Sequence, residues 1–159
     1  MEQEVVLEFL QKSEKAALFT IHFKNDNESE FTKFMLKYRG DAKLNKDYQR
    51  IIFAVSKCLE VGVLERFFRP EGKVKDNVCA LPIESGKLRL YCLRLSDKIL
   101  IIGNGGVKAT KTYNDNTELS GYVLTLQKFD EILRMELKKG TITIEQMEIA
   151  GYEDKIYKL

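Results

Sequence analysis

Two arginines and a tyrosine are set close together in the segment LRLYCLRL, residues 88–95. Side chains alternate along a regular strand, so Arg89 and Tyr91 would face one way and Arg94 the other. A bulge near Cys92 would instead bring the two arginines and the tyrosine onto one face and leave the leucines toward the core. Arginine binds phosphate in bidentate fashion and tyrosine can stack on a base, so such a face would suit RNA. The alternative is a solvated sheet face without that role.

A glycine-rich segment with two lysines, GNGGVKATKTY at residues 103–113, follows an apolar run. A P-loop needs lysine directly after its last glycine, but Val107 stands there. A dinucleotide fingerprint needs a third glycine where this chain has Lys108. The spacing therefore excludes both nucleotide loops. Glycines within a strand are typical of a bulge, a bend or a close backbone approach, so we expect a bent strand junction that delivers Lys108 and Lys111 beside the arginines.

Positive charge is concentrated in the middle of a chain whose formal net charge is only +2. Residues 65–111 carry ten Lys/Arg against five Asp/Glu, a difference of +5. Residues 1–64 carry ten of each, and residues 112–159 carry six against nine. A basic segment of this kind predicts an anionic partner, unless it is simply a solvated surface. The further RNA-binding residues that we predict in it are Arg66, Arg69, Lys73 and Lys75.

Composition excludes several classes of protein. The 159 residues are 44% hydrophobic and 31% charged, which predicts one globular domain with a full core. No apolar run approaches the roughly 20 residues of a transmembrane helix, and the N-terminus lacks the features of a signal peptide. The three cysteines are odd in number and widely spaced, which predicts reduced core thiols in a cytoplasmic protein. With no CxxC pair and a single histidine, His22, we expect no metal or other cofactor.

Three segments have the pattern of strands. Residues 17–24 are β-branched and aromatic, whereas residues 5–11 fit either a strand or a short helix. Residues 88–95 and 99–102, joined by a tight turn, are typical of an antiparallel hairpin. The second strand of that hairpin has four consecutive apolar residues, which predicts a central strand covered on both faces.

Helical spacing of apolar residues appears in three places. Residues 31–38 predict a helix that an Asn27–Glu30 capping box would begin. The other expected helices run from Asn45 or Asp47 to Gly62 and over residues 119–138, and the tail at 141–159 could add a short strand and a partial helix. The order of elements predicts an α+β fold, a single domain over residues 1–159 with a mostly antiparallel sheet packed against two N-terminal helices and an added long C-terminal helix.

This element order, together with the pattern LRLYCLRLSDKILIIGNGGVKATKTY, resembles the RelE/HigB-like toxins of bacterial type II toxin–antitoxin systems, in the RelE/ParE superfamily. The resemblance covers about residues 18–126, with the helix and tail at 117–159 extending beyond the family core. It implies a ribosome-dependent mRNA endonuclease that works without metal. It also implies a cognate antitoxin as partner, for example a helix-turn-helix protein from a neighbouring gene.

The resemblance also implies roles for the basic residues, because such toxins cut by attack of the 2′-hydroxyl on the adjacent phosphate. Arg89 and Arg94 would stabilise the phosphate, and Tyr91 would stack on a base or transfer a proton. Lys108 or Lys111 would supply the other charge or the acid.

This chain departs from the family pattern in its lysines, which Ala109 and Thr110 separate, and in Gly106-Val107, which replaces an aromatic. The alternative is therefore a non-catalytic protein of the same fold. It would bind a partner through its long C-terminal helix, Leu119–Lys138, or poison another target such as gyrase.

Overall fold

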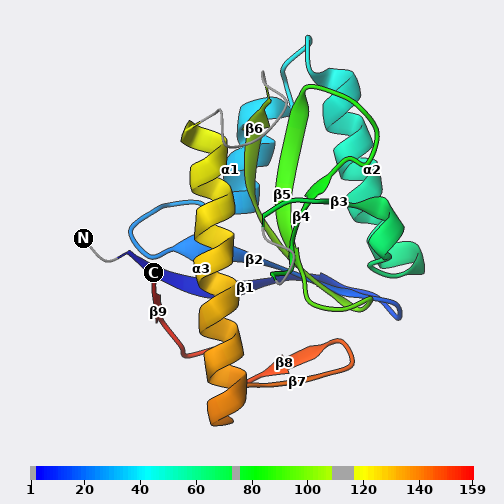
Figure 1. The fold of residues 1–159 in the computed structure, drawn as a ribbon. Coiled ribbons are helices and arrows are strands. Elements are labelled where there is room, and N and C mark those ends of the chain that lie inside the picture. The colour runs from blue at the N-terminus through cyan, green and yellow to red at the C-terminus, as the bar shows by residue number, and fades with distance from the viewer. Residues whose placement is uncertain (1–2, 73–75, 109–116) are drawn as a thin grey trace.

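A sheet of seven strands carries most of the hydrophobic core (Figure 1). The structure is a computed structural model and describes residues 3–72, 76–108 and 117–159. The strands lie in the order β3-β4-β5-β6-β2-β1-β9, and among these described pairs only β2 and β6 run parallel. Their bounds are β1 Glu4–Lys12, β2 Ala17–Phe23, β3 Arg69–Pro70, β4 Val78–Leu81, β5 Leu88–Arg94, β6 Ile99–Val107 and β9 Tyr157–Lys158.

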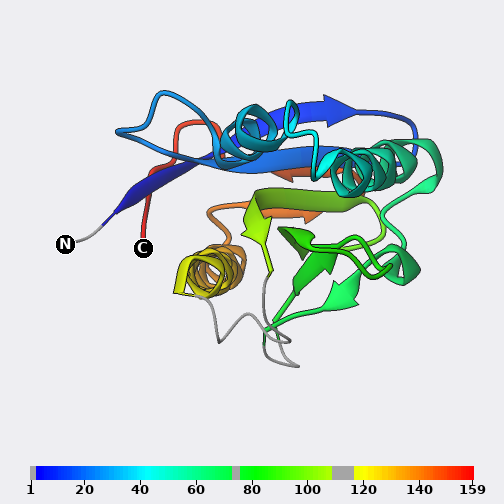
Figure 2. The ribbon, with the colours of Figure 1, turned by 90° about the horizontal axis from the view of Figure 1, so that it is seen from above.

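Helices cover both faces of this sheet (Figure 2). Helices α1, Glu30–Tyr38, and α2, Asn45–Val61, lie on one face, and α3, Thr117–Lys139, packs on the other. The described residues thus form one mixed α/β domain with three α-helices and a mostly antiparallel sheet, as the sequence predicts. The prediction of two helices at the N-terminus is wrong in their placement. The hairpin β1–β2 comes first, and residues 5–11, which fitted either element, belong to a strand.

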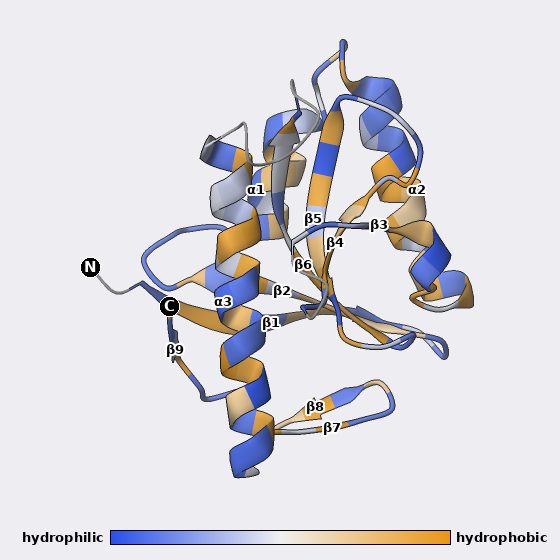
Figure 3. Cartoon of the chain, viewed as in Figure 1, coloured by the Kyte–Doolittle hydropathy of each residue, from blue (hydrophilic) through white to orange (hydrophobic). Residues whose placement is uncertain are grey.

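Strand alternation divides the apolar side chains between two cores. Tyr91 of β5 packs beneath α3, whereas Leu88, Leu90 and Cys92 pack beneath α1 and α2. Residues 99–102 of β6 are fully buried and alternate between the two cores, which confirms the prediction of a central strand covered on both faces. In Figure 3, hydrophobic and hydrophilic residues alternate along α3, as expected of a helix that packs one face on a sheet.

The three glycines at 103, 105 and 106 are part of strand β6, which ends at Val107. Helices α1 and α3 approach it closely. A Cβ atom on Gly106 would lie 3.1 Å from a methyl carbon of Leu119 and 3.3 Å from the hydroxyl oxygen of Tyr38. The glycines therefore allow two helices to pack against one strand, which is the close backbone approach that the sequence predicts.

The pairing of β5 with β6 contains one irregularity, and the extra residue lies in β6. Residues 90–92 of β5 lie opposite residues 102–105 of β6, so three steps along one strand match two along the other. Strand β5 itself alternates regularly, which places Arg94 on the face of α1 and α2 with Cys92. Of the two alternatives for this strand, regular alternation is confirmed, and a bulge that gathers Arg89, Tyr91 and Arg94 on one face is wrong.

Two local predictions also need correction. The cap of α1 is Ser29 and not Asn27, because the Ser29 hydroxyl accepts a hydrogen bond from the Thr32 amide at 3.2 Å. The tail forms a hairpin of β7, Thr143–Glu145, and β8, Glu148–Ala150, followed by β9, and its described residues contain no helix. Within the described part of the chain, no helix combines the length and the apolar character needed to cross a membrane.

Candidate functional site

Arg69 and Tyr91 lie in one row across strands β3, β4 and β5, because each of them pairs with Ala80. Paired residues of antiparallel strands project to the same face. Ala80 and Tyr91 belong to the core beneath α3, so the row faces that helix. Arg89 precedes Tyr91 by two residues and shares its face. The structure thus brings together three of the residues that the sequence singles out.

The guanidinium of Arg89 is buried with more donors than acceptors. The residue is 5% exposed, and its Nη1 donates to the carbonyl oxygens of Gly86 at 2.8 Å and of Leu88 at 3.0 Å. Its Nε is buried and has no acceptor within the described residues. Burial and the neighbouring charge of Arg69 lower the pKa of Arg89. A buried guanidinium with a spare donor is a favourable position for an anion.

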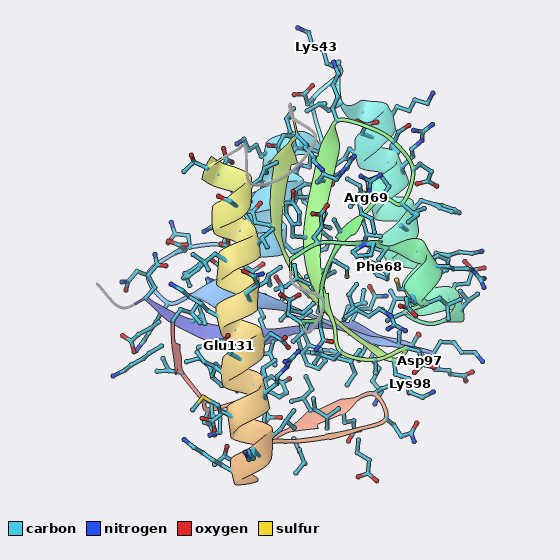
Figure 4. All side chains as sticks on the ribbon, in the orientation of Figure 1. Lys43, Phe68, Arg69, Asp97, Lys98 and Glu131 are labelled. Atoms are coloured by element: carbon cyan, nitrogen blue, oxygen red, sulfur yellow. The ribbon has the colours of Figure 1, made fainter. Side chains whose placement is uncertain are left out.

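Arg69 is the second guanidinium with a buried, spare donor. Its Nη2 donates to the carbonyl oxygens of Ile83 at 3.2 Å and Glu84 at 3.5 Å, which ties β3 to the segment after β4. Its Nε, like that of Arg89, is buried without an acceptor in the part of the chain that the structure describes. Figure 4 labels Arg69 and Phe68 beside β3, well apart from Glu131 on α3.

A lysine and a carboxylate complete the group. The Nζ of Lys108 lies 4.0 Å from Oε1 of Glu71, and the two side chains are only 9% and 10% exposed. Burial raises the pKa of Glu71, although three cations of the group, Lys108 foremost, oppose that shift. A carboxyl whose pKa moves toward neutrality is suited to proton transfer. We call Arg69, Glu71, Arg89, Tyr91 and Lys108 the basic cluster.

Glu71 was not among the residues predicted from the sequence. The only signal for it is that it is the one acid in the basic stretch 66–75. Its position opposite Lys108 depends on the pairing of β3 with β4 and of β5 with β6, and no local sequence pattern predicts that pairing.

Tyr91 is the fully buried member of the basic cluster and belongs to the core beneath α3. Stacking on a base requires an exposed ring, so the ring as packed does not offer that contact. The negative charge that its phenol could carry favours the protonated form of Arg89. The predicted role of Tyr91 in proton transfer stays a prediction.

A pocket of about 460 Å³ adjoins the basic cluster at the β3–β4 edge of the sheet, and Glu71 lines it. The other charged side chains on its wall are Glu65, Asp76 and Arg94. Three carboxylates against one arginine make the pocket itself unfavourable for phosphate. Glu71 is the one member of the basic cluster that lines this pocket.

The remaining predicted site residues do not join the basic cluster. Arg94 lies on the opposite face, where its Nε donates to the Val63 carbonyl oxygen at 2.9 Å. Arg66 is exposed, with its guanidinium 5.5 Å from the centre of the Phe67 ring. The predicted residues that fall outside the described part of the chain are Lys73, Lys75 and Lys111.

The three cysteines are buried together on the face of α1 and α2, as predicted for core thiols. Burial raises the pKa of Cys58 and of Cys79 to about 12, so neither thiol forms a reactive thiolate near neutral pH. No group of three or more His, Cys, Asp or Glu side chains with the geometry of a metal site occurs among the described residues.

Comparison with known proteins adds no relative from which a function could be transferred. No protein-family model matches the chain, and neither a curated protein nor a solved structure matches it. A functional conclusion therefore depends on the side chains described above.

Proposed function

We propose that this chain is the toxin component of a toxin–antitoxin pair and cuts messenger RNA on the ribosome through the basic cluster. The observation that supports this most is a pair of guanidinium groups, Arg69 and Arg89, whose buried Nε atoms have no acceptor within the described residues. Buried polar groups are nearly always hydrogen-bonded, so spare donors at this position favour an anionic ligand. Two arginines on one sheet face next to Lys108 suit the oxygens of a phosphodiester.

The proposed reaction uses the 2′-hydroxyl of the RNA as nucleophile. Its oxygen attacks the adjacent phosphorus, the bond from phosphorus to the 5′-oxygen breaks, and the products end in a 2′,3′-cyclic phosphate and a 5′-hydroxyl. Glu71 accepts the proton of the attacking hydroxyl, for which its raised pKa suits it. Arg69 and Arg89 stabilise the negative charge that builds on the phosphate. Lys108 donates the proton that the departing 5′-oxygen needs.

The proposal includes a protein that keeps the toxin inactive. A cognate antitoxin would cover the basic segment 65–111 and keep RNA from the cluster. Its own charge would be acidic where it meets the arginines, because that segment carries ten cations against five acids.

The test is cleavage of a defined mRNA on purified ribosomes by the full chain, with the ends of the products identified. Glu71→Gln keeps the size of the side chain, Arg69→Gln shortens it, and each variant removes one charge. We expect each to lower the cleavage rate about a hundredfold or more, since each removes a group that acts in the transition state. Lys43→Gln, which removes an exposed charge in the α1–α2 connection, serves as the matched control and should cut like the parent chain.

Two results would overturn the proposal. A folded parent chain that leaves ribosome-bound mRNA intact would exclude it, as would products that carry a 5′-phosphate. If Lys43→Gln lost as much activity as Arg69→Gln, the loss would reflect total charge and not the basic cluster. Circular dichroism of each variant separates these outcomes from unfolding.

A further inference from the structure

Helix α2 buries one face against the sheet and leaves a large aromatic side chain in solvent on another. Its buried face consists of Tyr48, Ile51, Val55 and Cys58. Phe53 lies between them in sequence and is 67% exposed. A single exposed apolar side chain is common on protein surfaces, whereas a contiguous exposed apolar patch marks an interaction site.

Phe53 forms part of a groove of about 710 Å³ between α2 and two later segments of the chain. Phe67, from the short 3-10 turn before β3, lines the groove, and so does Ile83, from the segment after β4. Ile83 is itself 45% exposed, so apolar surface continues across the groove. The segment that bears Ile83 is held from both sides, by Arg69 at its carbonyl oxygen and by Arg50 at the carbonyl oxygen of Ser85, 3.5 Å away. The groove is therefore built from anchored elements.

The charged side chains that line this groove are mostly cationic. Lys46, Arg50 and Lys57 line it from α2, whereas Glu84 is the one carboxylate among its lining residues. Together with Phe53 these three cations recur at four, three and four residues, which places them in a single stripe along the helix. The stripe spans about three helical turns, or roughly 17 Å.

We propose that this groove binds an acidic amphipathic helix from a protein partner. The apolar side chains of that helix would contact Phe53, Phe67 and Ile83, and its carboxylates would pair with the cations of the α2 stripe. The length of the stripe sets the length of the bound segment at about three turns. The lining is mostly apolar, with aliphatic Ala54 and Ile83 beside the two phenylalanines, which favours the apolar side of a helix over the charged backbone of RNA.

This inference goes beyond the proposed cleavage and does not depend on it. The groove lies on the face of α1 and α2, whereas the basic cluster faces α3. None of the three cations of the stripe belongs to the basic cluster. Binding in the groove can therefore be measured without RNA and without ribosomes.

The experiment uses the full chain and three synthetic peptides of about 14 residues, which is about four helical turns. The first carries leucines in one helical stripe flanked by glutamates, the second has the same composition in scrambled order, and the third replaces each glutamate by lysine. We expect the first alone to bind, as measured by fluorescence anisotropy, with an affinity that falls as salt rises. Its binding should shift the NMR signals of α2 and of residues 83–85.

Variants locate the binding surface. We expect the affinity for the acidic peptide to fall about tenfold or more in Phe53→Ser, as at a hot spot. The double variant Lys46→Glu with Arg50→Glu should lower it to a similar extent. The matched control is Leu124→Ser with Lys128→Glu, which makes the same kinds of change on the exposed side of α3. The control should leave the affinity unchanged, and all of these variants should keep the activity that the parent chain shows toward RNA.

Several results would overturn the inference. One is failure of the acidic peptide to bind at low salt, and another is equal binding of the scrambled or lysine peptide. An equal loss of affinity for the acidic peptide in the α3 control would show that the peptide binds elsewhere on the chain. Binding of a single-stranded RNA oligonucleotide that Phe53→Ser abolishes would assign the groove to nucleic acid. Self-association that Phe53→Ser abolishes, measured by analytical ultracentrifugation, would assign it to a second copy of this chain.

Discussion

Two polar regions beside the same sheet differ in how fully their buried groups are hydrogen-bonded. At the point where β2 and β6 separate, Glu30 accepts from Lys33 Nζ at 2.6 Å and from Asn104 Nδ2 at 3.4 Å. The side-chain Oδ1 of Asn104 accepts from the Gly105 amide at 2.7 Å. We call Glu30, Lys33 and Asn104 the fork network. In the basic cluster, by contrast, two guanidinium Nε atoms are buried without an acceptor among the described residues.

The difference shows that burial alone does not mark a functional site. A complete network returns the free energy lost when its groups leave water, so it stabilises the fold and specifies where the strands separate. A cluster of like charges whose hydrogen bonds are incomplete lowers the stability of the fold, and binding of an anion restores that free energy. The fork network therefore has a structural role, and the basic cluster has the properties of a binding site.

The largest effect is expected at Gly105, which lies between the two regions. A methyl group there would collide with the carbonyl oxygen of Arg89, and the strand backbone cannot yield easily. We expect Gly105→Ala to lower the free energy of unfolding by about 3 kcal/mol or more, as overpacking in a core does. The measurement is urea denaturation followed by circular dichroism.

Gly121→Ala in α3 is the matched control, because a Cβ atom at that position meets nothing within 4 Å. Replacing a glycine inside a helix by alanine should raise stability by up to about 1 kcal/mol. If Gly105→Ala were tolerated as well as Gly121→Ala, the tight packing of β5 against β6 at Arg89 would be refuted.

The next largest effect on stability distinguishes the fork network from the basic cluster. Asn104→Ala removes the partner of Glu30 and of the Gly105 amide, and should lower the free energy of unfolding by about 2 kcal/mol. Arg89→Met removes a buried charge that lies near Arg69, so stability should stay equal or rise while RNA cleavage falls. Denaturation and cleavage are measured on the same preparations. Opposite results, a stable Asn104→Ala and an unfolded Arg89→Met, would reverse the assignment of the two regions.

The smallest effect is expected at a partly exposed pair on the β1–β2 hairpin. Hydrogen bonds to Glu8 and to the Asp26 carbonyl oxygen raise the pKa of His22 above its usual value. The folded chain therefore binds this proton more tightly than the unfolded chain. The stabilisation is complete below the unfolded pKa of about 6.5 and is lost as the pH rises through the higher pKa of the folded state.

As the pH rises, we expect this pair to lower the free energy of unfolding by less than about 1 kcal/mol, because its carboxylate is substantially exposed to solvent. Denaturation curves across neutral pH measure it, and His22→Gln should remove that part of the pH dependence. A parent chain whose stability rises through the same pH range, with His22→Gln unchanged, would contradict the assignment. The pair also agrees with a structural role for the single histidine.

Much of the fold could be predicted because its causes are local. The period of the apolar residues predicts β2, α1, α2 and α3, and the run at 99–102 predicts a central strand. The candidate site could be predicted only in part. Residue type and charge indicate Arg69, Arg89, Tyr91 and Lys108, but they do not indicate Glu71, and they leave two alternatives for the face of Arg94.

Those errors share one physical reason. Which face Arg94 occupies depends on whether the extra residue of a bulge lies in β5 or β6, and both strands contain residues that could accept it. Which carboxylate faces Lys108 depends on the pairing of strands that are far apart in the sequence.

The sequence by itself determined the type of most elements, the burial of the central strand and the types of residue available for chemistry, since these follow from periodicity and composition along the chain. Only the tertiary structure decided which residues lie next to one another. It showed that the glycines of β6 serve the packing of α1 and α3, that Glu71 faces Lys108, and that Phe53 lines a basic groove. Strand order and helix packing bring together residues that are distant in sequence, and no local pattern encodes such proximity.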